Sequence, residues 1–148
     1  MSKIIGTEEK VTKFEIDPLV AAKSGELTTL VYKCEEKKLS GLVLAFYGDR
    51  WNESGISYQA YAFKNLPINN ALEVLSKLEK IIEDESKFLS QDYDNNNMFF
   101  KYDDLTFLIY KIGGGGGSKI RVFWNGFNSD WETTALKRTK RRFEENIK

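Results

Sequence analysis

The spacing of apolar residues changes along this chain, and the change constrains the fold more than any single motif. Up to about residue 68, apolar and aromatic residues come in short runs with a period of two, which is typical of strands. From about Asn69 to Leu89 they recur every three or four residues, which is typical of an amphipathic helix. The strand pattern then returns, and a final helical pattern ends the chain. We therefore predict an α+β protein built on antiparallel sheet.

The first half contains three clear strand patterns separated by turn-forming stretches. These predicted strands cover 27–34, 39–47 and 56–63, with turns at 35–38 and 48–55. Val11, Phe14 and Ile16 indicate an earlier strand. The pair Asp17-Pro18 is typical of a helix start, and it predicts a short helical turn from Leu19 to Lys23 that Gly25 closes.

The second half repeats this order after the predicted helix and a polar loop at 90–97. Residues 98–102 and 105–112 are expected to form a hairpin across Asp103-Asp104, and 119–124 to form a further strand. Ser129 and Glu132 have the spacing of a capping box, which predicts that the last helix begins there. The expected apolar stripe of that helix consists of Trp131, Ala135, Thr139, Phe143 and Ile147.

The predicted order of elements suggests two similar halves, each with several antiparallel strands closed by a helix. In element order alone, this plan resembles the single-strand-binding folds of the whirly and PUR groups. The resemblance rests on the order of strands and helices, and no motif of either group is matched residue by residue. It implies binding of single-stranded nucleic acid.

Five consecutive glycines and a serine, at 113–118, lie between two of the predicted strands. Such a run has high backbone entropy and few side-chain atoms to pack, so we expect a flexible connection. Its composition is typical of an engineered linker, and we expect that it replaces a natural loop; a native run is the alternative. With 148 residues, the chain is expected to form one domain, 1–148.

The composition excludes many catalytic plans. The chain has no histidine, so histidine-based triads and His-ligated zinc sites are excluded, and it has neither a P-loop nor a dinucleotide-binding glycine motif. We predict a non-enzymatic protein without cofactor or metal. Asp92, Asp94, Asn96 and Asp103 match a calcium loop only weakly, and we expect a solvated turn there.

Three features bear on the cellular location. The single Cys34 cannot form an internal disulfide, the amino-terminal residues lack the apolar core of a signal peptide, and no apolar stretch approaches the length of a membrane span. We expect a cytoplasmic protein without membrane association.

The first candidate binding feature is a cluster of basic residues on the predicted last helix. Lys137, Arg138 and Arg141 are expected to point away from the apolar stripe, and Lys140 and Arg142 to flank it. Residues 119–148 carry eight basic and four acidic side chains, although the chain as a whole has no net charge. This asymmetry permits a phosphate-binding face; an ordinary solvated helix face is the alternative.

The second candidate feature is aromatic. Rings that stack on unpaired bases must be exposed beside cations, and Lys119 and Arg121 lie close to Trp124 in the sequence. Among the strand aromatics we expect Tyr58, Tyr102 and Trp124 to be exposed and most others to face a core. Trp51 falls in a charged stretch predicted to be a loop, where its indole suits either a contact or burial under the loop.

These features support two binding hypotheses. The first is a protein that binds single-stranded DNA or RNA through sheet aromatics and the cations of the last helix, Lys119 and Arg121. The second is a small protein-interaction module, such as an inhibitor or immunity-type partner, that docks an acidic protein. The sequence makes no prediction of oligomeric state.

Overall fold

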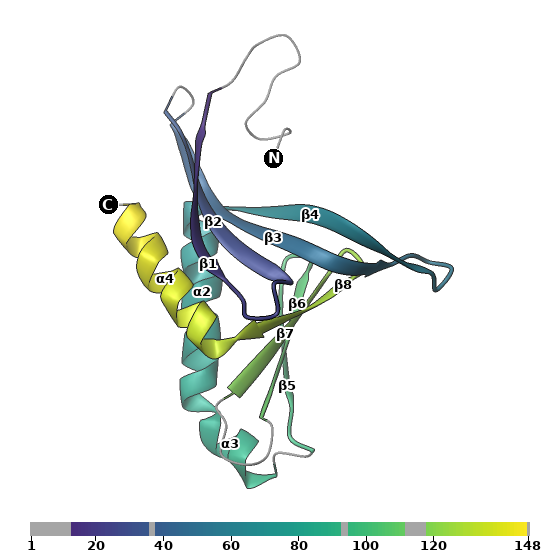
Figure 1. Cartoon of the computed structure of the whole chain (residues 1–148). Coiled ribbons are helices and arrows are strands. Elements are labelled where there is room, and N and C mark those ends of the chain that lie inside the picture. Colours follow the sequence, from purple (N-terminus) through teal and green to yellow (C-terminus); the bar gives the residue numbers. More distant parts are fainter. Residues whose placement is uncertain (1–12, 36–37, 93–94, 112–117, 148) are drawn as a thin grey trace.

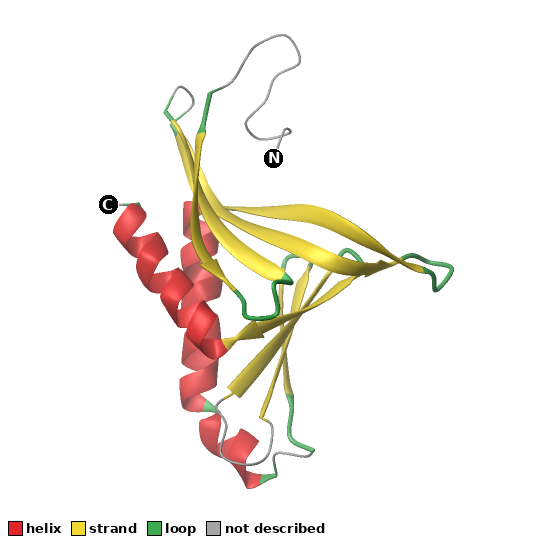
Figure 2. Cartoon of the chain, in the orientation of Figure 1, coloured by secondary structure: helices red, strands yellow, loops and turns green. Residues whose placement is uncertain are grey.

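The computed structural model describes residues 13–35, 38–92, 95–111 and 118–147. These residues form eight strands and three helices (Figures 1 and 2). In chain order the elements are β1 (Glu15–Ala21), β2 (Leu27–Cys34), β3 (Leu39–Trp51), β4 (Ser57–Pro67), α2 (Ile68–Asp84), α3 (Ser86–Gln91), β5 (Met98–Tyr102), β6 (Leu105–Lys111), β7 (Ser118–Trp124), β8 (Phe127–Glu132) and α4 (Thr133–Asn146).

All strands belong to one antiparallel sheet, which confirms the predicted α+β class. The hydrogen-bonded order is β1-β2-β3-β8-β7-β6-β5, and β4 pairs with the other edge of β3. The two halves meet where Arg50 of β3 pairs with Phe127 of β8. Each half is a four-stranded meander followed by helix. The predicted order of strands and then helix is present in both halves, but β8 is a fourth strand in the second half that the sequence pattern did not predict.

The helices lie on one side of the sheet (Figure 1). Helix α2 buries Ala71, Val74, Leu75, Leu78 and Ile82, at the spacing of an amphipathic helix. Helix α4 packs beside it and contacts β1 and β2, where the hydroxyl groups of Thr139 and Thr29 lie 2.8 Å apart in the core. Apolar side chains from both halves share one hydrophobic cluster.

The predicted helical turn after Asp17-Pro18 is wrong, because both residues belong to strand β1. Proline is tolerated there because β1 is an edge strand and its pairing with β2 shifts register between Pro18 and Val20. The chain reverses only afterwards, in a tight turn that Gly25 enters with φ of 76°. Phe14 precedes β1 and is exposed, and Val11 lies outside the described residues.

The predicted capping box is also wrong, because Ser129 to Glu132 form the end of β8. Asn125 and Gly126 both have positive φ and connect β7 to β8 in a two-residue hairpin turn. The alternation in β8 buries Ser129 and Trp131 on the helix side. Helix α4 begins only at Thr133, without a side-chain cap, and Trp131 joins the core from a strand.

Several boundaries also differ from the prediction. Strand β3 continues to Trp51, so Trp51 lies on a strand and the turn is confined to 52–56. The long helix divides at Glu85 into α2 and α3. Ser118 is buried as the first residue of β7, whereas Ile112 and the five glycines lie outside the described residues.

In the part of the chain that the structure describes, no helix combines the length and apolar character needed to cross a membrane.

Candidate binding surface on the open face of the sheet

The sheet face opposite the helices presents a row of aromatic side chains. In β3, Leu42, Leu44 and Phe46 point into the core, so the alternate positions point to the other side, which we call the open face. Part of the open face is filled by a small buried cluster of Tyr32, Cys34 and Val43. Beyond that cluster several open-face side chains of β3 and β4 are exposed.

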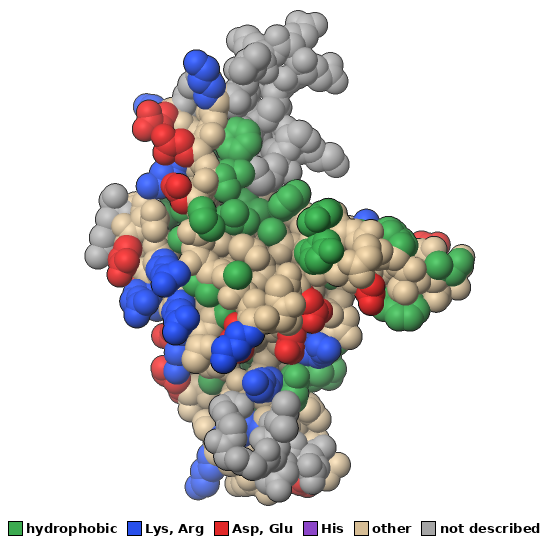
Figure 3. All heavy atoms as spheres, viewed as in Figure 1, with side chains coloured by type: hydrophobic (Ala, Val, Ile, Leu, Met, Phe, Trp, Pro, Cys, Tyr) green, Lys and Arg blue, Asp and Glu red, His purple; other side chains and the backbone are tan. Residues whose placement is uncertain are grey.

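Four of these exposed side chains, Tyr47 and Trp51 of β3 and Tyr61 and Phe63 of β4, form what we call the aromatic row. Their exposed fractions are 43%, 55%, 73% and 56%. Tyr47 and Tyr61 are directly opposite each other, with ring centroids 4.6 Å apart. They lie on an arm formed by the far ends of β3 and β4, which projects away from the helices (Figure 1). Figure 3 shows hydrophobic side chains extending along this arm.

A groove of about 470 Å³ leads from the aromatic row to the second half of the sheet. It lies beside β3, at the point where the neighbouring strand on this side of β3 changes from β2 to β8. The amide of Tyr47 bonds to the carbonyl of Glu26 just before β2, and the amide of Trp51 bonds to the carbonyl of Gly126 just before β8. Tyr47, Asp49 and Trp51 line one wall, and Arg121 and Asn128 line the other.

The cations of the open face come from β7. Arg121 lies opposite Asp130 of β8, and its guanidinium is 3.6 Å from that carboxylate. Lys119 lies opposite Glu132, whose carboxylate accepts a hydrogen bond of 3.0 Å from the backbone amide of Lys23. Both predicted cations therefore reach the open face, but each has an acidic neighbour in register.

Further aromatic side chains continue the open face beyond Arg121. Phe99 of β5 is 70% exposed, and Tyr110 of β6 lies half-buried opposite Lys119. Burial, together with the negative charge of Asp130, raises the pKa of Tyr110, and the positive charge of Arg121 only partly offsets this. Tyr110 therefore stays protonated at neutral pH and can donate a hydrogen bond.

The basic residues of α4 form a separate surface on the helix layer. Lys137, Arg138 and Arg141 are exposed on the side of α4 opposite the buried Thr139, and no ion pair joins any of the three to another described residue. Figure 3 shows the basic side chains that gather over α4. The structure thus does not unite the α4 cations and the aromatic row on one face.

The other two predicted basic residues of α4 contact the protein itself. Lys140 lies 2.9 Å from Glu144 and 3.7 Å from Glu79 of α2, and its hydrogen bond to Glu144 raises its pKa although burial opposes this. The guanidinium of Arg142 donates to the backbone carbonyl of Leu19 in β1. These contacts connect α4 to its neighbours.

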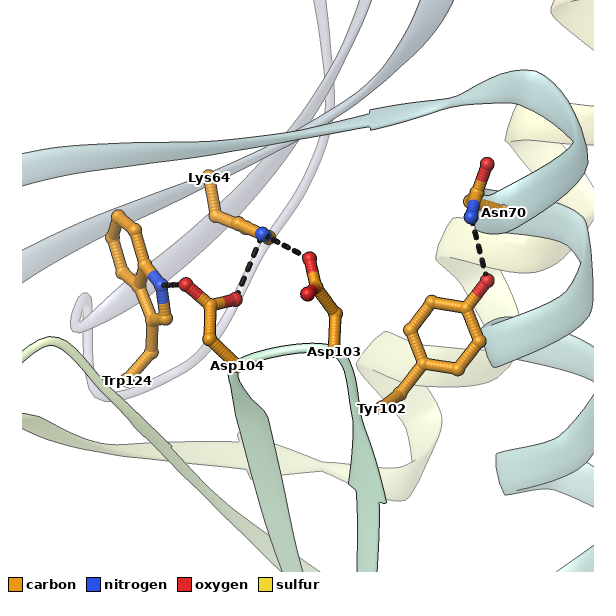
Figure 4. Close-up of polar contacts among 6 residues, drawn as sticks. All are labelled: Lys64, Asn70, Tyr102, Asp103, Asp104 and Trp124. Carbon is orange, nitrogen blue, oxygen red and sulfur yellow. Dashed lines mark hydrogen bonds and ion pairs between the residues drawn. The ribbon is translucent and has the colours of Figure 1, made fainter.

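Two of the predicted exposed aromatics have structural contacts instead (Figure 4). The indole of Trp124 is half-buried, packs 5.0 Å from the ring of Phe46 and donates a 2.9 Å hydrogen bond to Asp104. The hydroxyl of Tyr102 accepts a 2.9 Å bond from Asn70 of α2. The expectation of exposure is therefore wrong for both rings. Tyr58 is exposed as expected, but alternation places it on the opposite face of β4 from Tyr61.

Asp104 also belongs to a cluster that joins the two halves of the fold. The ammonium group of Lys64 in β4 lies 2.7 Å from both Asp103 and Asp104 in the β5–β6 turn (Figure 4). Burial alone would raise the pKa of Asp104, but hydrogen bonds from Lys64 and Trp124 outweigh burial and lower it. Burial opposes the charge of Lys64 as well, yet its bonds to the two carboxylates raise its pKa.

Sequence reasoning did not single out Tyr47, Tyr61, Phe63 or Phe99 as exposed, although all four are. Alternation shows which residues share a face but not which face the helices cover, so no signal in the sequence separates Tyr47 from a core tyrosine. Among the described residues, no group of three or more acidic or cysteine side chains is arranged to hold a metal ion. Comparisons with known proteins match no family model, no curated protein and no solved structure.

Proposed function

We propose that this protein binds single-stranded DNA or RNA across the open face of its sheet. The observation that carries the proposal is the aromatic row, in which four exposed rings lie on one face of two neighbouring strands. Exposed rings on an open antiparallel sheet provide stacking surfaces for unpaired bases, and stacking tolerates any base. The element order shared with the whirly and PUR groups supports the same function.

The groove supplies the direction in which a strand would run. Bases stacked on Tyr61 and Tyr47 would lead toward the wall formed by Arg121 of β7. Lys119 is two residues away from Arg121 on β7 and points to the same face. These two cations would contact phosphates. The carboxylates of Glu26, Asp49 and Asp130 lie nearby and limit the affinity through repulsion, so we expect moderate binding that weakens as salt rises.

The test compares two tyrosines of the same strand on opposite faces. Tyr61→Ala removes a ring of the aromatic row and should weaken binding of a fluorescent single-stranded oligonucleotide by about 1 to 3 kcal/mol. Tyr58→Ala removes another exposed ring, on the other face of β4, and should leave the affinity nearly unchanged. Equal losses in the two variants would contradict an open-face site.

A second candidate function, docking of an acidic protein, is favoured by the basic surface of α4. Lys137, Arg138 and Arg141 are exposed without a described ion-pair partner. They lie on the helix layer, which a nucleic-acid strand bound to the open face would not contact. Such a surface steers an acidic partner electrostatically. Loss of partner capture in a variant with all three replaced by Ala, with nucleic-acid binding retained, would separate this function from the first.

A further inference from the structure

We infer that the free edge of strand β4 pairs with the same edge of a second copy of this chain, in antiparallel orientation about a two-fold axis. The inference concerns the edge of the arm and does not depend on what binds the open face. It rests on three observations, which are the direction of the backbone groups of β4, the absence of edge protection, and the symmetry of the exposed segment.

The backbone of β4 directs alternate amides and carbonyls away from β3. The amides of Tyr47 and Trp51 in β3 bond toward Glu26 and Gly126, on the side of β3 opposite β4. Their cross-strand partners, Tyr61 and Ser57, are therefore in non-hydrogen-bonded pairs with β3. It follows that Ser57, Gln59, Tyr61 and Phe63 present their backbone amides and carbonyls at the free edge, where no described strand pairs with them.

The other two edge strands of this sheet are protected, whereas the outer part of β4 is not; Lys64 and Pro67 lie at the inner end of β4. Strand β1 carries Glu15, Asp17 and Pro18 together with a register shift, and the short β5 carries Lys101. Charges, prolines and irregular pairing are the usual means of preventing edge-to-edge association. The segment from Ser57 to Phe63 has none of them and adds exposed tyrosine and phenylalanine side chains. A long, uncharged edge of this kind is expected to be covered by another strand.

The exposed segment fits a second copy better than an unrelated peptide, because antiparallel pairing of identical strands is self-complementary. A two-fold axis at Ala60 would pair Ser57 with Phe63 and Gln59 with Tyr61 in each direction. All four residues with edge-directed backbone groups would then be hydrogen-bonded, and no charged side chain within the segment would face its own copy. The arm projects beyond the helices, so the helices leave the edge accessible (Figure 2).

The paired arms would join two sheets into one and would place two aromatic rows side by side. Tyr61 of one copy would lie beside Gln59 of the other on the same open face. The inference therefore predicts a dimer whose open face is continuous across the two-fold axis.

The test removes one edge-directed amide. In Gln59→Pro, the missing N–H points away from β3, so the β3–β4 hydrogen bonds stay intact while dimer pairing loses a donor. Gln59→Ala is the matched control, because it removes the same side chain and its bond to Asp49 but keeps the amide. Sedimentation equilibrium should give the parent and Gln59→Ala a mass near twice the 17.1 kDa of the chain, and Gln59→Pro a monomer mass.

A further variant guards against misfolding of the proline variant. Gln59→Glu keeps every backbone group but adds a second negative charge beside Asp49 on each edge, and it should also give a monomer, with the circular dichroism spectrum of the parent. A monomeric parent at high micromolar concentration would overturn the inference. Dimers of unchanged stability in both Gln59→Pro and Gln59→Glu would overturn it too, since the contact would then lie elsewhere.

Discussion

Tyr47 of β3 and Tyr61 of β4 lie opposite each other on the open face, with their ring centroids 4.6 Å apart and their planes tilted by 35°. Both rings are exposed, so this contact between them does not belong to the hydrophobic core. Aromatic pairs across neighbouring strands stabilise a hairpin. In the proposed function, a base would contact this preformed apolar surface without a rearrangement of the strands.

Neutralising Asp130 should strengthen nucleic-acid binding. The carboxylate of Asp130 lies 3.6 Å from the guanidinium of Arg121 and competes with any phosphate. In Asp130→Asn we expect tighter binding of a single-stranded oligonucleotide and a salt slope that is steeper by about 0.7, the value for one phosphate contact. Fluorescence anisotropy over a range of salt concentrations measures both. The control, Asp84→Asn, removes the same charge from α2, and an equal gain there would mean that only net charge matters.

Replacing Lys137, Arg138 and Arg141 together by Ala should leave binding of a short single strand nearly unchanged. These cations lie on the helix layer, on the far side of α4 from the core. The expected change in salt slope is less than about 0.7, below one phosphate contact. A decrease of about 2 in the same anisotropy experiment would show that the strand reaches α4, in contradiction to the open-face route.

Leu78→Ala should lower the free energy of unfolding by about 2 to 5 kcal/mol, because the side chain is fully buried between α2 and the sheet. Urea denaturation followed by circular dichroism measures the loss. Lys80→Ala lies on the exposed side of the same helix and should change the free energy of unfolding by less than about 0.5 kcal/mol. An unchanged urea midpoint in Leu78→Ala would contradict the helix-on-sheet packing.

Asp104→Asn should reduce stability at neutral pH but not in acid. The folded-state pKa of Asp104 is lowered, so its charge contributes stability above its unfolded pKa of about 3.9, and this is lost as pH falls through the folded value. Because the Asp104 side chain is 57% exposed, solvent screening limits the effect to about 1 kcal/mol. Urea midpoints of parent and variant, measured from neutral to acidic pH, should converge at low pH. A difference that persists in acid would mean that the charge of Asp104 is not the cause.

The sequence predicts most of the elements because their patterns are local. The spacing of Leu75, Leu78 and Ile82 identifies the helix face that packs on the sheet, and Asp103-Asp104 identifies the β5–β6 turn. Strand β2 has the predicted bounds, 27–34. In each case the residues that form the element also specify its period or its turn.

The errors come from local signals that tertiary pairing overrides. Asp17-Pro18 is a helix start in isolation, but it lies on an edge strand because β2 offers pairing that proline permits on that side. Ser129 and Glu132 match a capping box, but the Asn125-Gly126 turn returns the chain along β7 first. The Asn-Gly pair is a hairpin signal that the sequence contains, and in the structure the hairpin forms in place of the predicted helix start at Ser129.

Exposure of individual aromatics could not be predicted, because it depends on contacts between distant segments. Trp124 meets Phe46 and Asp104, and Tyr102 meets Asn70, all of them from other elements. The α4 cations lie on the helix layer and the aromatic row lies on the opposite face of the sheet, so their separation also depends on how distant segments pack. For this reason the sequence suggested one combined site, whereas the structure contains two surfaces.

The most direct test of the central claim is a salt titration of a fluorescent single-stranded oligonucleotide with the parent protein. We predict saturable binding at about 50 mM salt, where the phosphate contribution is strong, with affinity that falls as salt rises and with a clear preference over duplex of the same sequence. Absence of binding to single-stranded DNA and RNA at this salt concentration, or equal binding of the duplex, would contradict the account.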